Sequence, residues 1–169
     1  MTSDIVPSFT PVKYTAGYLP ISAHGLIGDG TTAALIGRDG AAVWLCIPRF
    51  HSPPLFCRIL DASKGEYFAV APEGLVESRQ YYHPHTGVLV TEMRSHTGTV
   101  RLTDALTLRS GIDLSEDTSA GHSELLRLVE ILHGQVRPCI EMLPHKGGHP
   151  KPHVGGLSIL YPSRPGIAL

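Results

Sequence analysis

Charge of one sign, long apolar runs and a targeting segment are all missing from this chain. Its 14 Lys and Arg balance 15 Asp and Glu, so the formal net charge over 169 residues is -1. Without a Lys/Arg cluster there is no electrostatic footprint for nucleic acid or an anionic membrane. No apolar run approaches the ~18 residues of a membrane span, and the first residues lack the basic start and apolar core of a secretory signal. We therefore expect a cytoplasmic protein that binds neither nucleic acid nor membrane.

Cysteine is scarce, and the recognised cofactor motifs are missing. Cys46, Cys57 and Cys139 are odd in number and lack Cys-x-x-Cys spacing, which favours reduced thiols over a disulfide framework or a zinc site. The His-x-His pair at 83–85 has a proline between its members, which disfavours a shared metal. The glycines between 25 and 30 have the wrong order for a dinucleotide fingerprint, and no Gly-Lys-Ser/Thr follows them. The sequence therefore predicts no cofactor and no metal.

The chain does contain a series of short β-like runs from about residue 18 onward, separated by Gly, Pro and Asp. This pattern is typical of an antiparallel, all-β sandwich and not of alternating βαβ units. The length suits one well-buried domain. We predict a flexible lead-in at 1–15, a sandwich domain at 16–145, and a Gly-, Pro- and His-rich tail at 146–169 that could add one strand.

Turn residues predict three hairpins in the sandwich. Strands 33–36 and 42–47 should pair across Asp39-Gly40, because Asp-Gly readily supplies the positive φ that a tight turn needs. Strands 88–93 and 100–105 should pair across Thr97-Gly98, and strands 125–132 and 136–142 across His133-Gly134. An acidic loop at 111–123, between the second and third hairpins, is expected to be mobile.

Two finer expectations concern strand 42–47 and the segment after it. Simple alternation puts Ala42, Trp44 and Cys46 on one face of the strand and the residues between them on the other. Both faces are apolar, which indicates a central strand covered on both sides. Ser52 as N-cap and Pro53 at the first helical position predict one short helix over 52–60. Pro138 predicts an edge position for its own strand.

Seven ordered motifs carry a family resemblance. They are YLPISAHGLIGDG (18–30), TAALI (32–36), DGAAVWLCIPRFHSPPLFCRILD (39–61), GEYF (65–68), RQYY (79–82), TGVLVT (86–91) and GTVRLTD (98–104). Together with weaker matches up to residue 144, they resemble the N-terminal domain of glycoside hydrolase family 15 proteins, the bacterial trehalases and glucoamylase-like enzymes. The resemblance implies a β-sandwich that precedes an (α/α)6 catalytic barrel.

The resemblance also implies that the catalytic machinery lies elsewhere. In this family the two carboxylic acids that cleave the glycosidic bond belong to the barrel, and glycoside cleavage generally needs both. The chain is too short for a sandwich plus a barrel and shows no repeated amphipathic helices. We therefore expect a chain that stops before the barrel, contains no catalytic residue and is inactive alone. Its expected partners are the barrel, in cis or in trans, and an α-glucoside such as trehalose or a maltooligosaccharide.

Three residues are candidates for contact with the substrate or the barrel: Trp44, Arg49 and His51. A tryptophan ring can stack on the apolar face of a sugar, and Arg can donate to sugar hydroxyls. The competing interpretation is structural, with Trp44 in the core and Arg49 paired with Asp29 or Asp61. The chain also departs from the family here, because Val43 and His51 occupy positions where the family usually has aspartate.

Two other hypotheses remain open at this stage. The chain could be a stand-alone module that binds sugars or docks onto a separately encoded barrel. Alternatively, it could be the product of a decaying gene that folds poorly without its partner surface. An exposed apolar patch on one side of the sandwich would indicate a missing partner.

Overall fold

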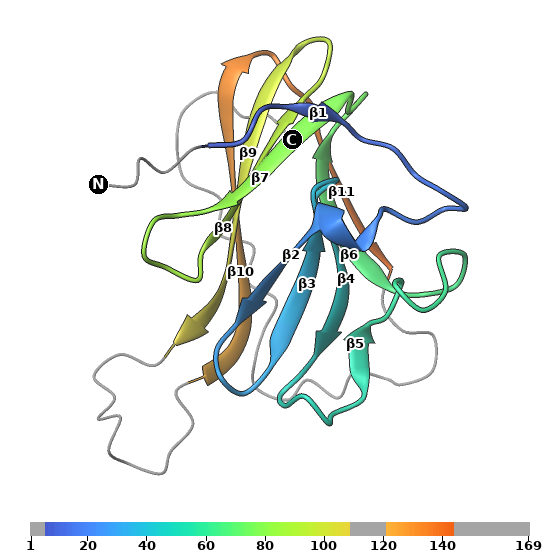
Figure 1. Ribbon diagram of the computed structural model, residues 1–169, viewed down its shortest axis with the longest axis vertical. Helices are drawn as coiled ribbons and strands as arrows, with labels where there is room; N and C mark the ends of the chain where they lie inside the picture. The colour runs from blue at the N-terminus through green and yellow to red at the C-terminus, as the bar shows by residue number, and fades with distance from the viewer. Residues whose placement is uncertain (1–5, 109–120, 144–169) are drawn as a thin grey trace.

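The computed structural model describes residues 6–108 and 121–143 (Figure 1), which form two antiparallel sheets packed face to face. The five-stranded sheet has the order β1-β7-β8-β9-β10. Its strands are β1 (Thr10–Pro11), β7 (Glu77–Tyr82), β8 (Leu89–Arg94), β9 (Gly98–Leu108) and β10 (Gly121–Gly134). The fold is the predicted all-β antiparallel sandwich.

The six-stranded sheet has the order β11-β6-β4-β3-β2, with β5 paired to β4. Its strands are β2 (His24–Gly28), β3 (Ala33–Gly37), β4 (Ala41–Cys46), β5 (Pro54–Phe56), β6 (Tyr67–Pro72) and β11 (Pro138–Leu143). The short 3-10 helix η1 (Ile21–Ala23) precedes β2. Two predictions are thereby confirmed: the strand expected at 42–47, which is β4, is central, and the strand that begins at Pro138 lies at an edge.

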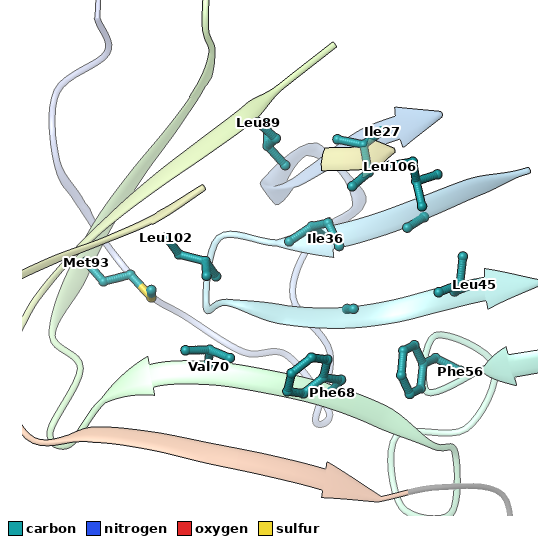
Figure 2. Packing of buried hydrophobic residues seen from close by; sticks show 12 residues of the cluster. Ile27, Ile36, Leu45, Phe56, Phe68, Val70, Leu89, Met93, Leu102 and Leu106 are labelled. Carbon is teal, nitrogen blue, oxygen red and sulfur yellow. The ribbon is translucent and has the colours of Figure 1, made fainter. Parts of the chain in front are cut away.

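The main apolar cluster of the core lies between the two sheets (Figure 2). The cluster of buried residues consists of Ile27, Ala34, Ile36, Ala42, Leu45, Phe56, Phe68, Val70, Leu89, Met93, Leu102 and Leu106. These residues recur at every second position along β3 and β6, because alternate side chains of a strand point to the same face. Burial of this apolar surface is the main favourable contribution to folding.

Two of the predicted hairpins are confirmed. β3 pairs with β4 around the turn at Asp39 and Gly40, where Gly40 has a φ of 80°. β8 pairs with β9 across the turn that contains Thr97. In both cases a short connection returns the chain directly beside the preceding strand.

The third hairpin prediction is wrong. β10 pairs with β9, and β11 pairs with β6 in the other sheet. Only residues 135–137 connect β10 to β11, so this short segment crosses from one sheet to the other. The positive φ of Gly134 (74°) ends β10 as expected. A glycine turn specifies where the chain changes direction but not which strand it meets next.

The helix predicted over 52–60 is also wrong. The chain forms the short strand β5 there, in which Phe56 pairs with Leu45 of β4, and then turns at 58–60. The helix-start signal of Ser52 and Pro53 is local. Pairing with the central strand, with Phe56 fully buried in the core, outweighs it.

The remaining predictions concern the lead-in, the tail and the acidic loop. The expected lead-in at 1–15 contributes β1, which pairs with β7, and Phe9 lies against the guanidinium groups of Arg79 and Arg94. The tail at 146–169 lies outside the described residues. So does the expected acidic loop, apart from residues 121–123, which begin β10.

Candidate functional site

Trp44 lies on the outer face of the six-stranded sheet, away from the core. The register places Trp44 opposite Leu35, and Leu35 opposite Leu26, so the three side chains form a row on one face. Leu26 is exposed, and Trp44 is partly exposed. None of them belongs to the core cluster.

A β-bulge explains why simple alternation misplaced the neighbours of Trp44. The register shifts between Leu35 and Ile36, so Ala42 pairs with Ile36 while Trp44 pairs with Leu35. Val43 is the extra residue of the bulge. Ala42 and Leu45 therefore both face the core, and Trp44 does not share a face with Ala42.

Arg49 and His51 lie in the loop between β4 and β5, and both are exposed. Backbone contacts fix this loop locally. The Phe50 amide donates to the Thr31 carbonyl at 3.1 Å, and the Arg49 amide donates to the Ser52 hydroxyl at 3.1 Å. The loop is thus held beside the β2–β3 turn, and its side chains point away from the core.

The ion pairs suggested for Arg49 do not form in the described part of the chain. The Asp61 carboxylate accepts hydrogen bonds from Ser63 and from the Lys64 amide. The bond from Ser63 is the main reason why the pKa of Asp61 is lowered. Oδ1 of Asp29 accepts the amides of residues 31 and 32 at 2.9 and 2.8 Å. The Arg49 guanidinium is therefore available for an external acceptor.

Asp29 has a buried carboxylate with only one oxygen satisfied. Its Oδ2 has no hydrogen-bond partner among the described residues. Gly121 packs against this oxygen so closely that a Cβ at position 121 would collide with it. A buried, unpaired acceptor is uncommon. Asp29 therefore adds a polar group to the end of the sandwich where Arg49 and His51 lie.

Two other buried carboxylates, those of Glu92 and Asp104, are paired with arginine, and the carboxylate of Glu66 accepts from the Cys57 thiol. Glu92 binds Arg79 and Arg101, and Asp104 binds Arg127. Each of these arginine-paired carboxylates has a structural partner, and the Arg127–Asp104 pair connects the two sheets. Among residues 6–108 and 121–143 there is no group of three or more His, Cys, Asp or Glu side chains placed to hold a metal ion. No helix in that part of the chain is long and apolar enough to cross a membrane.

Sequence reasoning missed one pocket, of about 540 Å³. Its wall combines apolar and polar side chains from three separate segments: Tyr14, Tyr18, Leu19, Ile21, His24, Asp39, Val43, Arg58 and Ile59. The pocket adjoins β4 through Val43, the immediate neighbour of Trp44. No spacing in the sequence indicates it, because these segments meet only after the two sheets have formed.

A hydrogen bond and a cation–π contact hold polar groups of this pocket in place. The Tyr14 hydroxyl donates to Oδ2 of Asp39 at 2.9 Å. Burial by neighbouring protein atoms, together with the Asp39 charge, raises the pKa of Tyr14 well above its usual value. The Arg58 guanidinium stacks on the Tyr67 ring at 4.1 Å. One cation and one anion line the pocket, so its net charge suits a neutral ligand.

Comparison with known proteins identifies a family that matches most of this chain. Residues 14–146 match the family model described as trehalase-like, N-terminal. The chain is 34% identical over 151 residues to the trehalase of Mycolicibacterium smegmatis, a match that covers 79% of this chain and 22% of that relative. It is 34% identical over 136 residues to the trehalase of Mycobacterium tuberculosis, covering 74% of this chain and 20% of the relative.

A third relative is more similar over a shorter stretch. The chain is 42% identical over 100 residues to the trehalase of Thermoplasma volcanium, covering 55% of this chain and 16% of that relative. In each case the chain spans less than a quarter of the curated relative. No solved structure matches it. With this fold and a family match over most of its length, the chain belongs to the trehalase-like N-terminal domain family.

Proposed function

We propose that the chain is the non-catalytic N-terminal domain of a trehalase-like or glucoamylase-like enzyme of glycoside hydrolase family 15. In this role it packs against an (α/α)6 catalytic barrel, in cis or in trans, and shapes the approach to a pocket for α-glucosides. The main support is the family match over residues 14–146 together with relatives at least four times as long as the matched segment. The free thiols Cys46, Cys57 and Cys139 support a reducing, cytoplasmic compartment.

Within this function, Trp44, Arg49 and His51 form the surface that contacts the barrel or the sugar. Arg49 and His51 are exposed on a loop whose backbone is fixed by hydrogen bonds, and Trp44 is the partly exposed end of an outward-facing row. The Arg49 guanidinium has no acceptor in the described part of the chain. An exposed donor of this kind, held on a fixed backbone, suits recognition of hydroxyl groups or of a partner carboxylate.

The direct test joins this domain to a catalytic region. Residues 14–146 replace the matching segment of the Mycolicibacterium smegmatis trehalase, and glucose release from trehalose is measured. We expect the joined protein to hydrolyse trehalose and the isolated chain to release no glucose. Arg49→Ala and Trp44→Ala should each lower kcat/KM at least tenfold, whereas the control Arg137→Ala, on a fully exposed side chain, should not. Glucose release by the isolated chain would contradict the proposal.

The pocket beside Val43 supports a second candidate, a stand-alone carbohydrate-binding module. Its aromatic and charged lining and its neutral balance suit a polyhydroxylated ligand. Trp44 is the only tryptophan, so its fluorescence reports on this side of the sheet alone. Saturable quenching or a blue shift with trehalose or maltose would favour the module, and an unchanged spectrum with both sugars would favour the first proposal.

A further inference from the structure

One side of the sandwich is bordered by two edge strands that have no second neighbour within residues 6–108 and 121–143. β10 is the last strand of the five-stranded sheet, and β11 is the last strand of the six-stranded sheet. Residues 135–137 connect the two strands, which are the orange arrows joined at the top of Figure 1. Arg127 of β10 bonds to the Phe68 carbonyl of β6, the strand beside β11, so β10 and β11 border the same side of the sandwich. Each leaves one row of backbone donors and acceptors without a strand partner in the described part of the chain. A long exposed edge is a template for pairing with more chain.

The side chains at this border face the core but remain exposed. Ile131 pairs with Val100, and Val100 is fully buried. Ile140 and Met142 pair with Val70 and Phe68, both members of the core cluster, so all three side chains share the core face. Yet Ile131, Ile140 and Met142 are 42%, 46% and 36% exposed. We name the surface formed by these three residues the open side.

The opposite side of the sandwich is closed by side-chain contacts between the two sheets. There the Tyr82 hydroxyl donates to the Leu26 carbonyl at 2.8 Å and accepts from the Leu26 amide at 2.9 Å. The Gln80 amide donates to the Ile36 carbonyl, and the core residue Leu89 packs against Gly25. Side chains thus close that border between the sheets. On the open side Arg127 of β10 donates to the Phe68 carbonyl of β6, yet Ile131, Ile140 and Met142 remain exposed.

We infer the segment that covers the open side from the relatives, whose chains continue beyond the matched domain. β11 ends at Leu143, and the match to the N-terminal family model ends at residue 146. The trehalase relatives contain more than three quarters of their length beyond the matched segment. Since this domain is N-terminal in that family, the remaining chain departs from the open side itself. A segment that leaves β11 there needs only a short turn to return along its free edge.

We propose that the open side is covered by an extended, apolar segment of the chain that follows this domain in trehalase-like enzymes. This segment pairs with the free edge of β11 and places apolar side chains on Ile131, Ile140 and Met142. The recognition is strand addition, in which backbone hydrogen bonds give affinity and alternate side chains give specificity. The inference rests on the proposed function, because it requires a longer catalytic partner.

Thiol labelling tests the contact in the joined protein described above. Met142→Cys probes the open side, and Leu60→Cys is the matched control on a loop residue that is 70% exposed. Both variants are treated with a maleimide, and the labelled positions are identified by peptide mass, which also reports on the natural thiols. In the isolated chain both new thiols should react. In the joined protein the thiol at position 142 should react at least tenfold more slowly, and the thiol at position 60 at an unchanged rate.

The outcomes separate this inference from the proposed function. If the joined protein hydrolyses trehalose but Met142→Cys reacts as fast as in the isolated chain, the inference is wrong and the function stands. If position 142 is protected in a joined protein that releases no glucose, the function is wrong and the inference stands.

Two measurements on the isolated chain need no joined protein. Replacing Ile131 and Ile140 together with Lys should lower its urea midpoint only slightly, because these side chains are already 42% and 46% exposed. A large loss of stability would make them part of the domain's own core and overturn the proposal. A dimer in solution that the same double variant converts to a monomer would make a second copy the occupant and would overturn it as well.

Discussion

Arg127 and Asp104 form an ion pair inside the sandwich, with side chains that are 3% and 0% exposed. Arg127 Nε donates to Asp104 at 2.7 Å, while Nη1 and Nη2 donate to the Phe68 and Gly40 carbonyls at 2.6 and 2.8 Å. One guanidinium therefore connects both sheets. Burial raises the pKa of Asp104, and the Arg127 charge opposes that rise.

Removal of one partner of this pair should destabilise the domain strongly. We expect Arg127→Met to lower the free energy of unfolding by about 3–5 kcal/mol, because it leaves a buried carboxylate without a countercharge. Replacing both partners, as Arg127→Met with Asp104→Leu, should cost less than the single change. Urea denaturation measures all three differences. The control Arg137→Met breaks the exposed pair with Glu73 and should cost about 0–1 kcal/mol.

The stability of the domain should depend on pH through Glu92. Burial alone raises the pKa of Glu92, but hydrogen bonds from Arg101, Arg79 and Tyr81 outweigh it and hold the pKa below its usual value. The unfolded chain therefore binds more protons in the acidic range, so stability rises with pH there. The contribution is complete above about pH 4.3, the ordinary pKa of Glu, and is lost as pH falls through the lower, folded-state value.

The variant Glu92→Gln isolates this contribution. The free energy of unfolding of the unmodified chain and of the variant is measured between pH 3 and 7. We expect the difference between them to be largest near neutral pH and to shrink below about pH 4.3. A difference that grows as the solution becomes more acidic would contradict the assigned direction of the shift.

Tyr82→Phe should weaken the closed border between β7 and β2. The phenol oxygen accepts the Leu26 amide and donates to the Leu26 carbonyl, so the substitution removes both bonds. We expect a loss of about 0.5–1.5 kcal/mol per hydrogen bond at most, and faster hydrogen exchange at the Leu26 amide. Tyr67→Phe, which loses only the exposed bond to Glu141, serves as the control. Unchanged exchange at Leu26 would show that Tyr82 does not hold this edge.

Gly40 and Gly30 offer a matched pair of substitutions. Both have a φ of 80°, so alanine adds a similar backbone strain of about 1–2 kcal/mol at either site. At Gly40 a Cβ would also collide with the Val70 carbonyl oxygen, whereas at Gly30 no atom lies within reach. Gly40→Ala should therefore cost distinctly more than Gly30→Ala in thermal unfolding. Equal costs would mean that the β3–β4 turn can move away from β6.

The sequence predicts the parts of the fold that depend on neighbours along the chain. Asp39-Gly40 and Thr97-Gly98 specify tight connections, and the β3–β4 and β8–β9 pairs follow from them. The helix expected over 52–60 does not form, because the N-cap signal of Ser52 competes with pairing partners that are close only in the folded sheet. The position of β11 was missed for a similar reason, since its partner β6 lies far away in sequence.

In the candidate site too, some features depend on the local sequence and others only on the tertiary structure. The residues Trp44, Arg49 and His51 could be named from the sequence, because their motif resembles a family. That Trp44 faces outward could not be predicted, since a single bulge residue reverses the alternation of β4. The pocket near Val43 could not be predicted either, because its walls come from three segments.

The amino-acid pattern by itself determined an antiparallel β domain of the trehalase-like N-terminal family. Apolar alternation and glycine turns are local, so they act before any tertiary contact exists. Only the tertiary structure decided which border of the sandwich is closed, at Tyr82 and Leu26, and which is left open, at Ile131, Ile140 and Met142. The physical reason is that exposure of a side chain depends on which strands lie beside it, and strand neighbours are chosen by long-range packing.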